Sequence, residues 1–464
     1  MKPNLLFVLL LSGCLSPAAT PPDTLVVGLE AAPPGLADPR PPGTGPISGL
    51  IFNGLFRRDE RFQAVADLAD SVDTITPLSY RIRLKKGFSF HDGRPLTAED
   101  VKRTVESVQQ DPSLAVLQRI KVVDPITVEI TLRQPDAGIW ENLCFGILPQ
   151  GVESGIGTGP YRIEKSSPES ILLVRNENYP GIQPKLGRIL FRVIPEAPVR
   201  AAELLRGRLD LLQDNLPPSL LDTLHRKGLP VATTEGVETV RLVFNLKEGP
   251  TARPAVRRAI FQALDLPALI AYGLQGMAEP AHGFLPTAHW AHSPETPSDP
   301  FDREKARTLL EEEGYPDPDQ AGPQVRFPLK LHLPPGSEES ARLIARSLRE
   351  IGIEVQAIPA NCEGDFQLCL VKETAGPLPD GWCGKNRNGY ANPIVDRLLE
   401  EIRVTADRRK QFELYSLVEK ILAQDLPHRV LYYEKRFAVY SPRLKGVRLR
   451  PDGGYEPFAE ITKP

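Results

Sequence analysis

The sequence predicts an α/β protein that is divided into two or more lobes. The chain has 464 residues, and the roughly 450 that follow an N-terminal signal segment are too many for one hydrophobic core. Patterns typical of strands and of helices also follow one another closely, most clearly between Tyr80 and Val108. A chain of this length with mixed patterns is expected to bury more than one core.

The first residues indicate where the protein works. Lys2 precedes an apolar run, Leu5–Leu11, that is far shorter than the about 20 residues needed to span a bilayer. We therefore interpret residues 1–13 as a signal peptide. The Leu-Ser-Gly-Cys sequence ending at Cys14 is similar to a bacterial lipobox, so we expect cleavage before Cys14 and lipidation of its thiol. Residues 14–23 would then be a lipidated tether, holding the protein on a bacterial membrane, outside the cytoplasm, in the periplasmic space or on the outer face of the cell.

The segment from Tyr80 to Val108 predicts a strand, two turns and a capped helix. Apolar and charged residues alternate from Tyr80 to Lys85, which is typical of a half-buried strand. Gly87 and the His91-Asp92-Gly93 sequence mark turns. Thr97 is a good N-cap, and Asp100 completes a capping box with Asp in place of Glu. The helix would bury one apolar face, made of Val101, Val105 and Val108. We interpret these residues as scaffold.

Four cysteines remain if Cys14 is lipidated, and an oxidising compartment allows them to pair. We expect one disulfide between two of Cys362, Cys369 and Cys383, and the sequence leaves the pair open because pairing depends on a Cα separation. The fourth, Cys144, lies far away in the chain. The cysteines lack zinc-ligand spacing, so no metal site is expected from them.

Several functions are excluded or disfavoured by composition and motifs. The net charge is −3 and the charged residues form no basic block, so nucleic acid is not an expected partner. The sequence contains no Gly-x-Ser-x-Gly, His-Glu-x-x-His or Walker motif, so we expect no enzyme and no cofactor. A transition-metal site is conceivable at three neighbouring histidines, but incidental positions in a loop explain them better: His282, His289 and His292.

Eight short segments resemble, in the same order, the motifs of one protein family. Each motif is weak alone, but their order along the chain is specific. The segments are Ile51–Phe56, Gly157–Tyr161, Asn176–Tyr179, Ala201–Asp210, Val256–Asp265, Asp302–Tyr315, Gly352–Val355 and Asn388–Asp396. The chain thus resembles, nearly from end to end, the extracytoplasmic solute-binding proteins of peptide- and nickel-type ABC importers. On the helix at Val256, we expect Arg257 and Arg258 to be solvated or paired with carboxylates rather than to bind an anion.

The resemblance implies a two-lobed periplasmic-binding-protein-like fold of type II with an extra inserted sub-lobe. Residues 24–44, 156–240 and 430–464 would form lobe I, residues 45–155 the sub-lobe, and residues 245–425 lobe II. A ligand bridging the lobes favours the closed form, because only that form makes both sets of contacts. An ABC permease with its ATPase would then receive the ligand.

The resemblance implies short peptides as ligands, with nickel chelates, haem or sugars as alternatives. The alternative function, outside transport, is a binding module for sensing or for peptide chaperoning. The family places a carboxylate for the peptide amino terminus in a segment that corresponds to Lys372–Asn386, which is shorter here and lacks the usual turn. The candidates in this segment are Asp380 and Glu373 as the acids, Trp382 as an apolar wall or a core residue, and Lys385 with Asn386.

Overall fold

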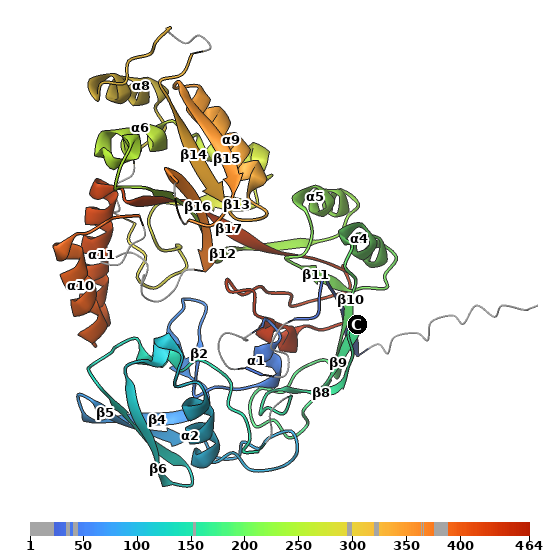
Figure 1. The fold of residues 1–464 in the computed structure, drawn as a ribbon. Helices are drawn as coiled ribbons and strands as arrows, with labels where there is room; N and C mark the ends of the chain where they lie inside the picture. Colours follow the sequence, from blue (N-terminus) through green and yellow to red (C-terminus); the bar gives the residue numbers. More distant parts are fainter. Residues whose placement is uncertain are drawn as a thin grey trace, which may run out of the picture.

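The structure is a computed structural model, and it describes residues 23–33, 38–39, 45–151, 155–294, 299–319, 324–362, 364, 366–374 and 388–464. Figure 1 shows three groups of elements arranged around a centre that two long strands cross, β12 (Val231–Phe244) and β17 (His428–Tyr440). We call these two the crossing strands. The groups are a first lobe on the right, a sub-lobe at the lower left and a second lobe at the top and left.

One continuous sheet runs through both lobes. Within the described residues it has eleven strands, in the order β15-β14-β16-β12-β17-β11-β1-β10-β9-β8, with β13 paired to β17 beside this path. The remaining bounds are β1 Thr24–Leu29, β8 Tyr161–Ser166, β9 Ser170–Arg175, β10 Arg188–Val193, β11 Leu211–Gln213, β13 Ala278–Pro280, β14 Phe327–Leu333, β15 Ile353–Pro359 and β16 Leu368–Thr374. The crossing strands therefore join the lobes by backbone hydrogen bonds as well as by the chain.

The first lobe is built on β1, which is buried along its whole length and pairs in parallel with β10 and β11. Parallel strands buried on both faces read as unbroken apolar runs, and Leu25-Val26-Val27 is such a run. Leu25 and Val27 belong to one core cluster, and Val26 belongs to a second one with residues of α4 and α5. The helices are α1 Ser48–Ile51, α4 Ala197–Leu205, α5 Pro218–Arg226 and the short η4 Glu456–Glu460.

The sub-lobe has its own core around an antiparallel sheet, β4-β5-β7-β6, with α2 packed against it. The predicted strand and capped helix are confirmed: Thr97 N donates to Asp100 Oδ2 at 2.9 Å and the box closes in both directions. The elements are β2 Phe56–Arg58, β3 Ala64–Ala66, β4 Ala69–Thr76, β5 Ser79–Leu84, α2 Ala98–Ser107, η1 Pro112–Leu114, β6 Leu117–Asp124, β7 Thr127–Leu132 and α3 Ile139–Asn142.

The second lobe packs helices on the β14-β15-β16 end of the large sheet. Side chains cap several of its helices at their N-termini, as at Asn392 and Asp407, which accept from backbone N–H groups of the first turn. A disulfide joins Cys362 to Cys369 with a Cα separation of 5.6 Å, which confirms the expected bridge. The helices are η2 Pro250–Ala252, α6 Pro254–Gln262, α7 Leu266–Ala268, the π-helix η3 Leu269–Gly273, α8 Arg303–Glu312, α9 Glu338–Arg349, α10 Pro393–Val404 and α11 Arg408–Asp425.

A buried polar network fixes the sub-lobe to the first lobe. Asn53 Nδ2 donates to Asp67 Oδ2 at 3.1 Å, and Thr158 Oγ1 donates to Asn53 Oδ1 at 3.2 Å. His91 Nδ1 accepts from Gly157 N at 3.2 Å, so His91 Nε2 is the nitrogen that donates to the Gly159 carbonyl at 3.1 Å. Burial lowers the pKa of His91, which keeps this neutral pattern. The bonds of Asn53 and His91 to residues 157–159 join the sub-lobe to the first lobe.

The predicted lobe boundaries stay a proposal, with one observation that bears on them. Residues 47–52, at the start of the predicted sub-lobe, pack in the core cluster of β1. Buried residues between Leu55 and Ile147 form the sub-lobe core, whereas Leu148, near the end of the predicted sub-lobe, packs in the core cluster of β1. Within the described part of the chain, no helix combines the length and apolarity needed to cross a bilayer.

Candidate ligand-binding site at the crossing strands

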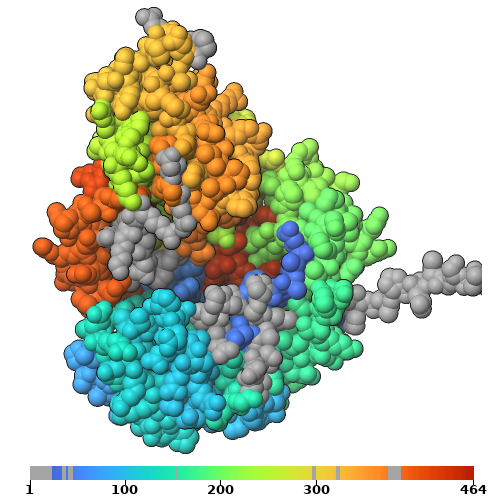
Figure 2. Space-filling view, in the orientation of Figure 1, coloured from blue at the N-terminus to red at the C-terminus, as the bar shows by residue number. Residues whose placement is uncertain are grey.

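The crossing strands carry an irregularity where they pass between the lobes. Their pairing register shifts between Glu235 and Thr239, so residues 236–238 leave the regular ladder. Val237 N donates instead to the Pro451 carbonyl, at 3.2 Å, in the C-terminal loop. A Cβ at Gly236 would lie 2.4 Å from the Glu434 carbonyl oxygen, so the strands approach too closely here for another residue type. Figure 2 shows the molecule hollowed at its centre, with C-terminal residues, in dark red, recessed there.

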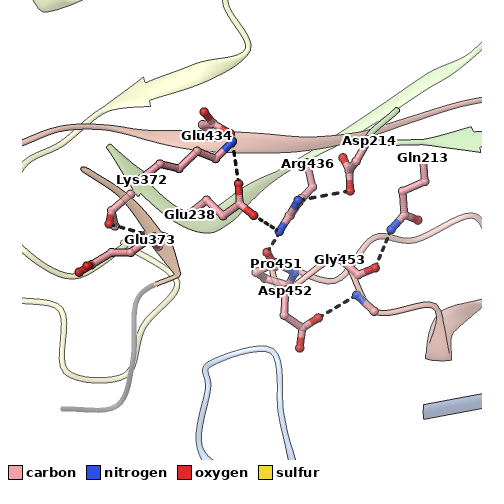
Figure 3. Close-up of polar contacts among 12 residues, drawn as sticks. Gln213, Asp214, Glu238, Lys372, Glu373, Glu434, Arg436, Pro451, Asp452 and Gly453 are labelled. Carbon is pink, nitrogen blue, oxygen red and sulfur yellow. Dashed lines mark hydrogen bonds and ion pairs between the residues drawn. The ribbon is translucent and has the colours of Figure 1, made fainter. Parts of the chain in front are cut away.

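Five charged side chains surround this irregularity, and we call them the hinge cluster: Asp214, Glu238, Lys372, Glu434 and Arg436. Lys372 Nζ lies 2.7 Å from Glu434 Oε2 and 3.1 Å from Glu238 Oε2. Arg436 Nη2 lies 3.3 Å from Glu238 Oε1, and Arg436 Nη1 lies 3.8 Å from Asp214 Oδ2. Figure 3 shows these charges as a chain that runs from β16 of the second lobe to the end of β11 in the first.

The backbone explains why these side chains meet. Glu434 and Arg436 are two residues apart on β17 and so point to the same face of the sheet. Lys372 and Glu238 are diagonal neighbours on the paired strands β16 and β12. Asp214 follows the end of β11 with a left-handed φ of 55°, and its Oδ1 accepts from Phe437 N at 2.7 Å. Strained residues of this kind persist where their surroundings hold them.

The cluster holds three acids against two bases. Burial raises the pKa of Asp214 to about 6, although Arg436 opposes the rise. Burial would also raise the pKa of Glu238, but Arg436 and Lys372 lower it below its ordinary value. The Lys372 side chain keeps 44% of its exposure and that of Glu434 keeps 32%, so solvent reaches the cluster. It can therefore exchange contacts with a charged ligand.

The C-terminal loop connects the cluster to the sub-lobe. Arg436 Nε donates to the Pro451 carbonyl at 3.4 Å, and Gln213 Nε2 donates to the Gly453 carbonyl at 2.9 Å (Figure 3). In the same loop, Arg450 Nη2 donates to Asp452 Oδ2 at 2.6 Å and to the Arg58 carbonyl of β2 at 3.0 Å. Parts of both lobes and of the sub-lobe thus meet at one place.

The structure describes only one of the ligand-binding residues predicted from the sequence. Glu373 lies on β16, where its carboxylate forms an ion pair with Arg241. Successive residues of a strand point to opposite faces, so Glu373 does not share the face of its neighbour Lys372. The others lie outside the described residues: Asp380, Trp382, Lys385 and Asn386, together with Cys14 and Cys383.

The histidine and arginine predictions have separate outcomes. Among the described residues no group of His, Cys, Asp and Glu side chains could hold a metal ion. His289 is buried and burial lowers its pKa to about 3, while His292 Nδ1 lies 2.8 Å from the Leu285 carbonyl.

Arg258 pairs with Asp299 at 3.2 Å, as expected. The expectation for Arg257 was wrong, because this side chain is buried and donates to backbone carbonyls, including that of Thr251 at 3.0 Å.

Sequence reasoning missed the hinge cluster. A signal for part of it does exist, because Glu434-Lys435-Arg436 interrupts an otherwise apolar run from Val430 to Tyr440. Charges inside a buried strand need partners, so such an interruption predicts a polar site. The partners themselves come from β11, β12 and β16, which are far away in the sequence.

Comparison with known proteins agrees with this architecture. The family described as bacterial extracellular solute-binding proteins, family 5 Middle, matches residues 63–380. The oligopeptide-binding protein AppA of Bacillus subtilis is 24% identical, with 87% of this chain and 84% of that protein covered. The glutathione-binding protein GsiB of Pectobacterium atrosepticum is 26% identical over 88% of this chain and 87% of its own.

A solved structure supports the fold. NikA from Brucella suis, in complex with Fe(III)-EDTA, has a TM-score of 0.83 at 21% identity, covering 95% of this chain and all of its own. The predicted fold class, two α/β lobes with an inserted sub-lobe, is thereby confirmed. The chain belongs to the family 5 bacterial extracellular solute-binding proteins, which are extracytoplasmic, non-enzymatic substrate-binding components of ABC importers.

Proposed function

We propose that this protein is a lipid-anchored binding component that captures short peptides between its lobes by closing around them and delivers them to an ABC permease and its ATPase. The observation that carries the proposal is the hinge cluster. It places solvent-accessible charges of both signs beside the irregularity through which the lobes are connected. A ligand that contacts this place touches both lobes, which is the condition for a ligand to favour closure.

A short peptide suits this site because it is a zwitterion. Its ammonium and carboxylate groups need charged partners when closure removes them from water. Two relatives are named for binding an oligopeptide and glutathione, which supports this ligand class. We keep Asp380 as the proposed partner of the ligand ammonium and Trp382 as the proposed apolar wall. Glu373, Lys385 and Asn386 stay candidates at the same site.

Native mass spectrometry of the purified protein, followed by calorimetry with synthetic di- to pentapeptides, tests the ligand class. We expect peptide binding, and we expect Asp380→Asn to weaken it severalfold or more, because the ligand ammonium loses its charged partner. The matched control is Glu312→Gln, which removes an exposed acid of α8. Binding of haem, a nickel chelate or a sugar, with no peptide bound, would overturn the ligand class. Hydrolysis of the titrated peptide would contradict a purely binding role.

The lipid anchor is tested at Cys14. We expect Cys14→Ser to abolish labelling by a radioactive fatty acid and to change both signal processing and membrane fractionation. The thiol is the proposed acceptor, and attachment by two or more acyl chains is lasting. Equal processing and fractionation of the two proteins, with no label on the wild type, would exclude lipidation.

A further inference from the structure

The sub-lobe also contacts the second lobe directly, away from the crossing strands. Ala137 N donates to the Arg403 carbonyl at the end of α10, at 2.7 Å. Trp290 N donates to the Arg61 carbonyl at the tip of the β2-β3 hairpin, at 3.2 Å. The Phe62 ring at the same tip stacks on His289 with the ring centroids 6.2 Å apart. These contacts form a second connection, which we call the bridge, between the sub-lobe and the second lobe.

An ion pair with one buried partner is part of this bridge, and the Arg408 side chain in it is 39% exposed. Glu141 of α3, in the sub-lobe, is 2% exposed and pairs with Arg408 of α11, in the second lobe. Arg408 also lies over the Trp290 ring, 4.4 Å from its centroid, and donates to Gln411 Oε1 at 3.0 Å. A guanidinium over an indole is a favourable contact that strengthens when water is excluded. Arg408 therefore joins Glu141 of the sub-lobe to Trp290 and Gln411 of the second lobe.

Arg408 lies at a position where a positive charge destabilises its own helix. Arg408 is the first residue of α11, directly after the N-cap Asp407. A cation at a helix N-terminus opposes the helix dipole, so the position is unfavourable for the helix alone. The Trp290 ring, which is in the same lobe, is available to Arg408 in either state, but the carboxylate of Glu141 offsets this effect only while the sub-lobe and the second lobe are in contact.

Separation of the lobes breaks the pair. The sub-lobe is tied to the first lobe through Asn53, Thr158 and His91, so it moves with that lobe. Motion at the crossing strands then draws Glu141 away from Arg408. The pair stabilises the arrangement in which the sub-lobe and the second lobe touch, and contributes nothing once they are apart.

We propose that Glu141 and Arg408 form a latch that raises the affinity for every ligand of this protein by favouring the closed form. The inference rests on the proposed capture by closure. A ligand and the latch both favour the closed form, so their contributions to its free energy add. Loss of the latch therefore lowers the fraction of closed protein before any ligand binds. The latch touches no ligand, so its loss weakens unrelated ligands by one common factor, mainly through faster release.

Hydrogen exchange in the ligand-free protein tests the latch without a ligand. The amides of Ala137 and Trp290 donate across the bridge and so report its opening. We expect both variants to speed their exchange about tenfold or more, because Arg408→Ala leaves the buried Glu141 carboxylate unpaired and Glu141→Gln removes the charge that attracts Arg408. Arg409→Ala is the matched control, because Arg409 forms an exposed pair with Glu413. We expect it to leave both rates unchanged.

Two outcomes would overturn the latch. One is wild-type exchange at both amides in Arg408→Ala. The other is faster exchange throughout the β4-β5-β7-β6 sheet as well, which would show general destabilisation instead of opening. For two unrelated peptides that bind the wild type, Kd should rise by the same factor of about ten, and unequal factors would also contradict the latch. If no peptide binds the wild type, the proposed function fails while the exchange comparison still decides the latch.

Discussion

At the scale of single residues, Asp214 of the hinge cluster lowers the stability of the folded protein at neutral pH. Its carboxyl is held by Phe437 N and lies 3.8 Å from Arg436, yet burial raises its pKa to about 6 from an ordinary value of 3.8. A folded-state pKa above the unfolded one means that stability is fully present below about pH 4. It is lost as the pH rises from about 4 to about 6, because the unfolded chain ionises this acid in that range while the folded protein keeps it protonated.

We therefore predict that Asp214→Asn stabilises the ligand-free protein at neutral pH. Asn keeps an oxygen that accepts from Phe437 N and carries no charge to bury. The expected gain is about 1–2 kcal/mol, below the limit of about 3 kcal/mol that the shift in pKa sets, because the ion pair with Arg436 is lost. Thermal melts from pH 4 to pH 7 check this, and the gain should appear only above about pH 4. A lower Tm at pH 7 would contradict it.

Residues whose role is local could be predicted from the sequence. Thr97 and Asp100 are three positions apart, and the same spacing that suggested a capping box produces it. The sequence does not predict which two of Cys362, Cys369 and Cys383 form the disulfide, because the choice depends on the Cα separation of each pair. Asp214 and Arg436 could not be paired in advance, since their meeting depends on the alignment of β11 with β17.

At the scale of elements, β12 and β17 join the lobes through a regular ladder that is interrupted at one place. Along most of their length they form a regular antiparallel ladder that joins the lobes. At residues 236–238 the ladder is interrupted, and the C-terminal loop supplies a hydrogen bond through the Pro451 carbonyl. A bulge weakens pairing locally and increases the twist, so we place the hinge at this interruption. The sequence analysis predicted neither the length of β12 nor this irregularity.

We predict that Gly236→Ala destabilises the protein by about 1–3 kcal/mol. The added Cβ would lie 2.4 Å from the Glu434 carbonyl oxygen, which belongs to the backbone of β17 and cannot rotate away. The strands would have to move apart at the hinge cluster. Thr233→Ala, an exposed position of the same strand, is the control. Thermal melts compare the two variants, and equal Tm values would show that Gly236 is not needed.

At the scale of the whole molecule, the described residues connect the second lobe to the rest of the protein at the crossing strands and at the bridge to the sub-lobe. The sub-lobe and first lobe are joined by buried polar bonds, while the second lobe meets them at the crossing strands and at the Glu141–Arg408 pair. The order of eight motifs predicted this architecture from the sequence. It could not predict the contact between sub-lobe and second lobe, because no local pattern encodes a contact between lobes.

We propose that ligand capture and lobe closure are one event in this protein. Small-angle scattering of the purified protein, with and without a peptide that calorimetry has shown to saturate it, tests this most directly. We expect the radius of gyration to fall on binding, because the bound ligand favours the form in which both lobes touch it. A saturated protein with the same radius of gyration as the ligand-free one would contradict capture by closure.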